Sequence, residues 1–504
     1  MAHQPVVDPG AGSPVAPGRG AVETNGINVI AEEERRGRPR QLFWPWFGAN
    51  VSVLGLAYGS FLLGFGISAA QALVAGVVGI VVSFLLCGLV SIAGKRGSAP
   101  TLVLSRAAFG VTGNRVPAVL SWVYTVGWET VLVSLATLAT ATVFTQLGWG
   151  GGTATQVVAL LVVAALVVVG GVLGFDAIMR MQTVITVVGG VLTVVYVVLV
   201  AGRVDWSAVT ATRSGSTAAF VGALVLAMTG YGFGWVNAAA DYSRYLPRTA
   251  STPGVVGWTT FGGALAPVVL LAAGLLLAAS DPELSGAIGA DPIGALGAIL
   301  PTWFLVPFVV VAVLGLVGGA LLDIYSSGLS LLAAGLRVPR PVAAGIDGAL
   351  MVLGAVWVVF LAGSDFFIQF QGFLITLGVP IAAWCGVFLG DLALRRRAYA
   401  EPDLYDPRGR YGAVPPAPLL LLAGGTVLGW GLVTNGLAGW LDWQGYLLGP
   451  LGLGGREGDW AFANLGVLAA FLVGLLGTLA LRRSAVRTQE AAPPAAGRPP
   501  AGRV

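Results

Sequence analysis

The chain has 504 residues, of which 56% are hydrophobic and only 10% are charged. Soluble domains carry about 25% charged residues, so this composition and a mean hydropathy of +0.85 exclude an ordinary soluble protein. The net charge of +4 does not indicate nucleic-acid binding, because the basic residues are spread between long apolar segments. Cys87, Cys385 and the single histidine, His3, offer neither a disulfide framework nor a metal site, and we expect no cofactor.

Uncharged stretches of about twenty residues recur along the whole chain. A bilayer core about 30 Å thick requires about 20 apolar residues in a helix, and only internally hydrogen-bonded backbone is stable there. The sequence therefore predicts an all-α polytopic membrane protein with about 12 transmembrane helices. We predict spans at 47–67, 71–93, 117–146, 154–174, 183–201, 217–238, 254–278, 303–335, 342–361, 366–390, 417–437 and 462–481.

The regions around the spans predict the organisation of the chain. Residues 1–42 begin with a segment rich in Pro and Gly and 484–504 are rich in Pro and Ala, so both are expected to be disordered tails. The first ten spans, 43–398, form the predicted core. A loop at 399–416 precedes two additional helices within 417–483.

The basic residues predict the orientation. If the N-terminus is cytoplasmic, all of the 27 Lys and Arg except Arg203, Arg213 and Arg456 lie on the cytoplasmic side. Cytoplasmic loops carry the excess of Lys and Arg in membrane proteins. We therefore expect a multi-pass protein of the plasma (inner) membrane with both termini in the cytoplasm. Five tryptophans are expected at the membrane interfaces, since they fall at span edges: Trp149, Trp206, Trp303, Trp440 and Trp443.

Two spans carry features that weaken a helix. The first, from Trp44 to Gly59, and the sixth, around 230–237, are crowded with Gly and contain Asn. Glycine costs about 1 kcal/mol relative to Ala inside a helix. In transporters with inverted repeats, helices broken at corresponding positions expose backbone groups to substrate and ion. We predict discontinuities in both spans, with Gly55 and Gly59 next to the substrate.

Two carboxyl groups lie within predicted spans. Glu129 is near the middle of span three and Asp323 is within span eight. An intramembrane carboxylate costs about 2.5–3.5 kcal/mol on insertion scales, so each is either hydrogen-bonded to a neighbouring helix or functional. Burial favours the protonated form, and no histidine lies in a span; both are therefore candidates to carry a coupled proton. Trp128, beside Glu129, offers a flat face for stacking a planar heterocycle.

Several short motifs occur in order between residues 43 and 411. They are Phe43-Trp44-Pro45-Trp46-Phe47 with Asn50, Arg106-Ala107-Ala108-Phe109-Gly110, Gly127-Trp128, Ala240-Asp241-Tyr242-Ser243-Arg244-Tyr245-Leu246-Pro247, Asp323-Ile324-Tyr325-Ser326-Ser327-Gly328-Leu329-Ser330, and Gly390-Asp391-Leu392 followed by Arg395-Arg396-Arg397 and Tyr399. With these motifs the chain resembles the nucleobase–cation symporter family, specifically its purine-cytosine permease branch.

The resemblance implies a leucine-transporter-like fold with two inverted five-helix repeats and discontinuous helices 1 and 6. It also implies a secondary transporter, not an enzyme, that imports a nucleobase of the cytosine or purine class. The base would lie between Trp128 and a span-six aromatic, either Phe233 or Trp235. Relatives place an Asn on span eight near Gly319, where this chain has none; Glu129 and Asp323 are expected to supply the polar contacts.

The coupling ion and the substrate stay open at this level. Sodium-coupled relatives place hydroxyl residues on span eight, whereas Val309 to Gly319 contains no Ser or Thr, so proton coupling is favoured over sodium. One alternative is a transporter of another planar amide, such as hydantoin, allantoin or uracil, with sodium as its ion. A second is a non-transporting membrane sensor on the same fold. The sequence leaves the oligomeric state open.

Overall fold

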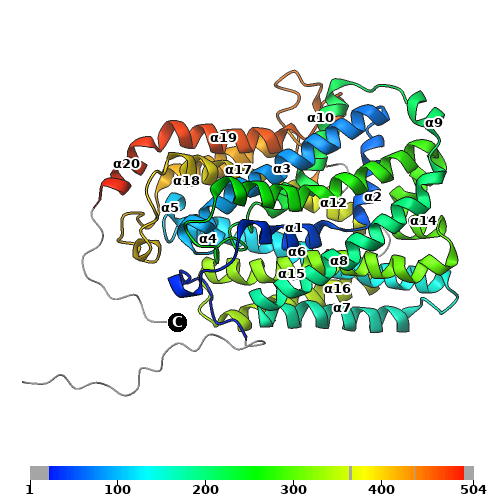
Figure 1. The fold of residues 1–504 in the computed structure, drawn as a ribbon. Coiled ribbons are helices and arrows are strands. Elements are labelled where there is room, and N and C mark those ends of the chain that lie inside the picture. The colour runs from blue at the N-terminus through cyan, green and yellow to red at the C-terminus, as the bar shows by residue number, and fades with distance from the viewer. Residues whose placement is uncertain (1–21, 363–365, 436–437, 493–504) are drawn as a thin grey trace, which may run out of the picture.

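The computed structural model describes residues 22–362, 366–435 and 438–492. All regular structure in these ranges is helical, and long helices lie side by side in one bundle (Figure 1). The unbroken long helices are α3 (Ala69–Gly97), α6 (Arg115–Gln146), α7 (Thr153–Leu173), α8 (Phe175–Val200), α12 (Thr252–Ser280), α15 (Leu305–Ala334), α16 (Arg340–Phe360), α17 (Phe366–Leu394) and α19 (Leu465–Leu481).

Shorter helices complete the bundle and its two ends. They are α1 (Phe43–Asn50), α2 (Leu54–Leu63), α4 (Thr101–Leu104), α5 (Arg106–Phe109), α9 (Trp206–Ala211), α10 (Thr217–Gly230), α11 (Gly232–Trp235), α13 (Pro282–Ala290), α14 (Pro292–Ala298), α18 (Pro416–Trp430) and α20 (Arg483–Ala491). Helices α4, α5 and α20 lie at one end of the bundle, and α9 and α14 lie at the other (Figure 1).

The number of membrane spans differs slightly from the prediction. In the described ranges, nine helices are long and apolar enough to cross a bilayer, or up to eleven when each bent pair counts as one span. Every predicted span contains a helix. The count of twelve is not confirmed because α18, in the eleventh predicted span, has only 15 residues.

Both predicted helix discontinuities are confirmed. Span one consists of α1 and α2, which are bent by 67° across the break at Val51–Val53. Span six is interrupted at Tyr231, whose φ of −123° and ψ of −104° are not helical. The short helix α11 follows, and the chain then continues as turns rather than as a long helix. Helix breaks within a membrane are tolerated where they are buried in protein or line a cavity.

Helix α15 packs directly against the first break because glycine lines its contact face. A Cβ atom at Gly315 would lie 2.3 Å from the carbonyl oxygen of Val51, and one at Gly318 would lie 2.5 Å from that of Gly48. No real Cβ contact is so short, so any side chain at these two positions would push α15 away from the break. The glycine-rich sequence of span eight therefore permits the close approach on which the site depends.

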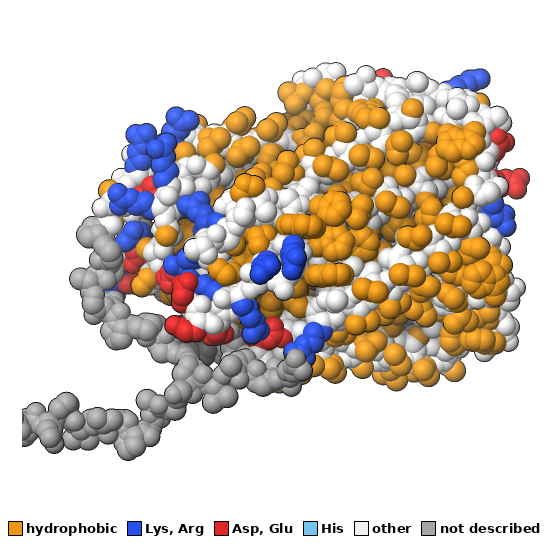
Figure 2. Space-filling model, in the orientation of Figure 1, with side chains coloured by type: hydrophobic (Ala, Val, Ile, Leu, Met, Phe, Trp, Pro, Cys, Tyr) orange, Lys and Arg blue, Asp and Glu red, His pale blue; other side chains and the backbone are white. Residues whose placement is uncertain are grey.

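The outer surface fits a membrane protein with one basic end. Apolar side chains cover the body of the bundle, and Lys and Arg gather at the end that carries α4, α5 and α20 (Figure 2). We call this the arginine-rich end; Arg106, Arg395 and Arg482 lie there beside α5, α17 and α20. The five tryptophans that the sequence placed at membrane interfaces are all exposed.

Parts of the predicted tails are ordered. Residues 22–42 pack against the bundle, with Ile30 fully buried, and α20 holds Arg395 through Gln489, whose Oε1 lies 2.7 Å from Arg395 Nη2. The prediction of disorder therefore does not hold for residues 22–42 and 484–491. The prediction failed because ion pairs and hydrogen bonds can hold a polar, Gly-rich segment, and composition does not reveal them. Residues 1–21 and 493–504 lie outside the described ranges.

Glu23 is the residue that fastens the N-terminal segment. Its carboxylate accepts hydrogen bonds from Arg244 Nη2 at 2.9 Å, from the Tyr325 hydroxyl at 3.0 Å and from the backbone N–H of Phe175 at 2.8 Å. Arg340 Nε lies 3.6 Å from the same carboxylate. One side chain therefore connects the arginine-rich ends of α8, α15, α16 and the segment after α11.

Replacing Glu23 with Ala is expected to lower the thermal stability of the detergent-solubilised protein. The change removes the carboxylate that is paired with Arg244, whose side chain is fully buried. Removing one partner of a buried ion pair costs about 3–5 kcal/mol of stability. The measurement is the unfolding midpoint of purified protein. The matched control is Glu32→Ala, because Glu32 is 70% exposed in its pair with Arg35. Equal midpoints for the two variants would contradict the fastening role.

Candidate functional site

A cavity lies where the two broken spans meet α6 and α15. The centres of water-sized spheres can occupy about 80 Å³ of it, and since about 10–15 Å³ holds one water, it has room for roughly five or more waters or one small ring. Its lining comes from four separate parts of the chain: Ala49, Asn50, Ser52, Leu54, Gly55, Tyr58, Trp128, Leu132, Gly230, Tyr231, Gly234, Trp235, Gly315, Gly319 and Asp323.

Aromatic side chains form much of the wall. Trp128 of α6 and Trp235 of α11 both line the cavity, and Trp235 is fixed by an edge-to-face contact with Trp46 at 5.9 Å between ring centroids. The rings of Tyr58 and Tyr231 lie 4.7 Å apart. Flat apolar walls with a few polar groups are typical of small-molecule sites, and aromatic faces suit a planar ligand.

The polar groups of the cavity come from both breaks and from α15. Asp323 lies one helical turn after Gly319, and the two line the cavity together. The Asp323 side chain is 2% exposed, and its carboxyl has no hydrogen-bond partner in the described chain. The buried hydroxyl of Tyr231 also has no hydrogen-bond partner among the described residues. Both groups are therefore free to bind a ligand.

The structure brings four of the predicted residues to the cavity, namely Trp128, Trp235, Asp323 and Gly55. It places the other three elsewhere. Phe233 points away and contacts Phe471 of α19 at 6.0 Å between rings. At Gly59 a Cβ would lie 2.1 Å from the backbone nitrogen of Leu275 on α12, so this glycine serves helix packing.

Glu129 is also outside the cavity lining. Consecutive residues of an α-helix point about 100° apart, whereas residues four apart share a face. Trp128 and Leu132 both line the cavity, so Glu129 faces another side of α6. It is fully buried there and lies near Ser327 and Asp347 instead.

Sequence reasoning did not select several lining residues, among them Tyr58, Tyr231, Asn50 and Leu132. Tyr231 stands inside the motif that predicted the sixth-span break, so its place at the break was a usable signal. Tyr58 is adjacent to Gly59 in the first span, but only the three-dimensional fold reveals which side of α2 faces the cavity.

The region behind the first break contains a neutral amide. Gln182 of α8 donates from Nε2 to the carbonyl oxygen of Gly318 at 2.6 Å, while its buried Oε1 has no partner in the described chain. Gly315, Gly318 and Gly319 bring no side-chain oxygen to this region. The side-chain N–H of Gln182 therefore occupies the carbonyl oxygen of Gly318, which could otherwise bind a cation.

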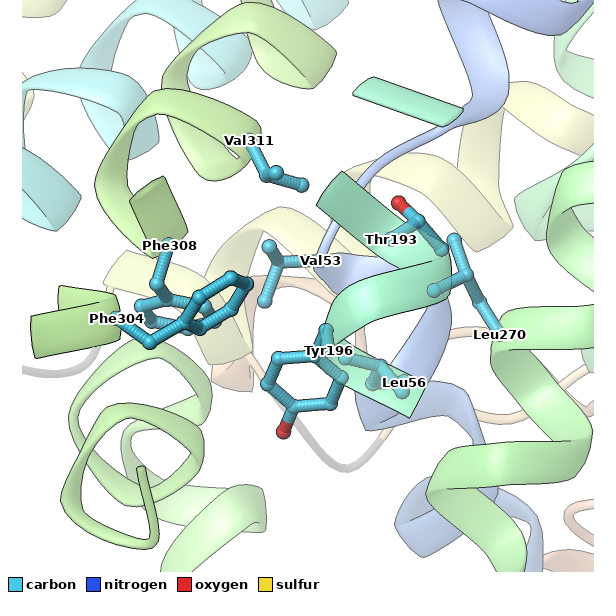
Figure 3. Close-up of a pocket in the computed structure, with 8 residues that line it drawn as sticks. All are labelled: Val53, Leu56, Thr193, Tyr196, Leu270, Phe304, Phe308 and Val311. Carbon is cyan, nitrogen blue, oxygen red and sulfur yellow. The ribbon is translucent and has the colours of Figure 1, made fainter. Parts of the chain in front are cut away.

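A second, smaller pocket lies beside the first break (Figure 3). Its lining is mostly apolar and includes Val53, Phe304 and Phe308, with Thr193 and Tyr196 of α8. Only about 10 Å³ of it admits the centre of a water-sized sphere, which is the room needed for about one water. It is too small for a heterocycle.

Apolar helices with two broken spans around a small aromatic cavity define a membrane transporter of the inverted-repeat type. The chain belongs to the family of permeases for cytosine/purines, uracil, thiamine and allantoin, which matches residues 29–440. This is the nucleobase–cation symporter family that the motifs indicated.

Known relatives agree with this assignment. YxlA of Bacillus subtilis (strain 168), itself only provisionally named a purine-cytosine permease, is 24% identical over 409 residues, which are 78% of this chain and 84% of that protein. Mhp1, a nucleobase-cation-symport-1 family transporter, is similar in fold. Its closed form with bromovinylhydantoin bound has a TM-score of 0.66 at 18% identity, covering 92% of this chain and 98% of that chain.

The inward-facing form of Mhp1 has a TM-score of 0.61 at 19% identity and covers 93% of this chain and 97% of that chain. These likenesses confirm the predicted leucine-transporter-like architecture.

Replacing Trp128 with Ala is expected to weaken substrate binding about ten- to a hundredfold, because stacking on an aromatic side chain is worth about 1–3 kcal/mol per base. Trp128→Phe should retain part of the affinity. The measurement is the concentration of unlabelled base that halves uptake of a radiolabelled base, in cells with equal amounts of transporter in the membrane.

The control uses the two aromatics of α11. Trp235→Leu should weaken the affinity, whereas Phe233→Leu should leave it within about threefold, because Phe233 packs on Phe471 outside the cavity. Normal affinity in Trp128→Ala, or a larger loss in Phe233→Leu than in Trp235→Leu, would contradict this assignment of the cavity.

Proposed function

We propose that this protein imports a nucleobase of the cytosine or purine class by proton symport and alternating access. The observation that carries the proposal is the cavity itself, in which Trp128, Trp235 and the partner-free carboxyl of Asp323 line one small space between two broken helices. The aromatic faces bind the ring, and Asp323 binds its polar edge.

Asp323 is the proposed coupling group in the cavity. An ionised carboxylate with no partner is strongly disfavoured at this depth, so an empty, closed cavity favours the protonated acid. A protonated carboxyl donates one hydrogen bond, and nucleobases present ring nitrogens and carbonyls as acceptors. Proton and base therefore stabilise each other in the cavity, and this reciprocity is what coupling requires.

The first break supports protons over sodium. Any side chain at Gly315 or Gly318 would collide with the carbonyl oxygens of Val51 or Gly48, and Gln182 already donates to the carbonyl of Gly318. A sodium site needs several converging oxygens, and here the neighbouring helix supplies backbone without hydroxyl side chains. The expected orientation, with both termini and the arginine-rich end in the cytoplasm, follows the positive-inside rule.

Uptake is expected to be equal in sodium and choline buffers and to fall when a protonophore collapses the pH gradient. Raising the external pH lowers the fraction of protonated Asp323, so the apparent affinity should fall, by up to about tenfold per pH unit for one bound proton. Asp323→Asn keeps the shape but cannot titrate. It should lose both accumulation against a gradient and the pH dependence, measured in proteoliposomes with an imposed pH gradient.

The matched control is Gln182→Leu, which removes the amide donor behind the first break but leaves the cavity lining intact. It should retain the proton dependence of uptake. A strong sodium requirement in the wild-type protein, or wild-type pH dependence in Asp323→Asn, would refute the proposed coupling.

A second candidate substrate class is a planar cyclic amide of the hydantoin type, because the similar fold of Mhp1 was solved with bromovinylhydantoin bound. A competition panel with cytosine, adenine, hypoxanthine, uracil, allantoin and hydantoin separates the two classes. Saturable binding of one of these compounds without flux into proteoliposomes would identify a sensor instead of a transporter.

A further inference from the structure

Glu129, Ser327 and Asp347 form a buried polar group outside the substrate cavity, where α6, α15 and α16 meet. We call it the carboxyl cluster. All three residues are fully buried. Ser327 Oγ lies 3.0 Å from Asp347 Oδ2, and Trp122 Nε1 donates to Asp347 Oδ1 at 2.8 Å. Ser327 and Asp347 are the polar neighbours that act most strongly on the Glu129 carboxyl.

The hydrogen bonds of the carboxyl cluster assign one proton and one negative charge. The indole N–H of Trp122 is only a donor, so Oδ1 of Asp347 is an acceptor, and two donors to one carboxyl suit its ionised form. Neither oxygen of Glu129 makes a hydrogen bond of normal geometry in the described chain, although Ser327 is near enough to act on its carboxyl. Burying an ionised carboxylate without a partner is strongly unfavourable, so Glu129 is the protonated member.

We propose that the carboxyl cluster is a proton relay that carries the coupled proton from Asp323 toward the arginine-rich end. This inference rests on the proposed proton symport. Ser327 Oγ has a lone pair left to accept a proton while its own proton faces Asp347. After a change of the Glu129 rotamer, the O–H bond of Glu129 breaks and a bond to Ser327 Oγ forms. Ser327 releases its own proton to Oδ2 of Asp347.

This step conserves charge. It begins with a neutral Glu129 and an ionised Asp347 and ends with an ionised Glu129 and a neutral Asp347, while Ser327 is unchanged. The ionised Glu129 then accepts the next proton from Asp323, the other carboxyl that acts on it. No oxidant or further reactant is needed.

The helix positions give the relay its direction. Ser327 lies four residues after Asp323 on α15, about 6 Å further along the axis at 1.5 Å per residue. Helix α15 ends at Ala334 and α16 begins at Arg340, which binds Glu23 at the arginine-rich end. Asp347 is two turns into α16 from that end. The carboxyl cluster therefore lies between the cavity and the expected cytoplasmic surface.

Other elements around α6 add no competing proton carrier. Helices α7 and α14, which pack on α6, contain no titratable residue. On α17 the described carboxylate, Asp391, is paired with Arg395 at 2.5 Å and Arg482 at 3.2 Å. The groups that face Glu129 are thus Asp347 from α16 and Asp323 from α15.

The test uses purified full-length protein in proteoliposomes that contain a pH-sensitive dye, with radiolabelled cytosine and hypoxanthine as probes. It measures proton influx and gradient-driven accumulation beside substrate exchange at equal pH. Glu129→Gln, Asp347→Asn and Ser327→Ala should each reduce accumulation at least tenfold more than they reduce exchange. Ser327→Thr restores the hydroxyl and should recover accumulation.

The matched control is Ser330→Ala. Ser330 lies three residues further on α15, is buried, and its Oγ is 3.0 Å from the neutral hydroxyl of Ser121. This variant should transport protons as the wild-type protein does. If the carboxyl cluster had a purely structural role, its variants would instead lower exchange and accumulation together. In Ser327→Thr the two activities would then also change together.

Infrared difference spectroscopy supplies a readout that does not depend on transport. The C=O stretching band that the protonated Glu129 contributes should be lost in Glu129→Gln and kept in Ser330→Ala. An unchanged band in Glu129→Gln overturns the assignment. Wild-type proton influx that survives in all three cluster variants overturns the relay alone, whereas absence of proton influx in the wild-type protein overturns the proposed symport and the relay with it.

Discussion

The structure depends on one constraint, which is that a helix broken inside hydrocarbon must find partners for the backbone groups it frees. The last carbonyls of α1 have no intrahelical partners. Helix α15 packs directly on them through Gly315 and Gly318, and Gln182 donates to the carbonyl of Gly318 on α15. The break is therefore covered by the backbone of α15 on one side and borders the cavity on the other. The same glycines bring no side-chain oxygen to this face of α15.

Glu129 and Asp323, the two carboxyl groups that the sequence placed within spans, have different surroundings. Helix geometry separates them, because Trp128 and Glu129 are neighbours on α6 and cannot share a face. Asp323 lines the cavity without a hydrogen-bond partner in the described chain, whereas Glu129 lies outside it, near Ser327 and Asp347. A membrane protein that keeps several unpaired carboxyls in its interior accepts a large desolvation cost. That cost is intelligible if protons, rather than arginines, neutralise them.

Much of this could be predicted from the sequence, and the failures have definite physical causes. Hydropathy predicted the spans, each of which contains a helix, and glycine content predicted both breaks. Both predictions succeed because hydrocarbon imposes strict length and hydrogen-bonding rules. Trp128 and Asp323 could be selected because each is unusual for its depth. The side on which a residue points could not be predicted where the helix is short, as for Phe233 and Trp235 on α11. The ordered segment at Glu23 was missed because its partners lie up to 317 residues away in sequence.

Under the proposed proton symport, the cavity accounts for why closure would require a proton as well as a base. The cavity that Asp323 lines also contains aromatic side chains, and the face of an aromatic ring repels an anion. While water fills the cavity, an ionised Asp323 is solvated; when the helices close over a base, that water leaves and the charge loses its solvation. Only the protonated acid, bonded to the base, satisfies both the rings and the ligand. The proposed relay through Glu129, Ser327 and Asp347 would then allow the proton to leave Asp323 without readmitting water to the cavity. The affinity of the cavity for the base would fall before the base is released from it.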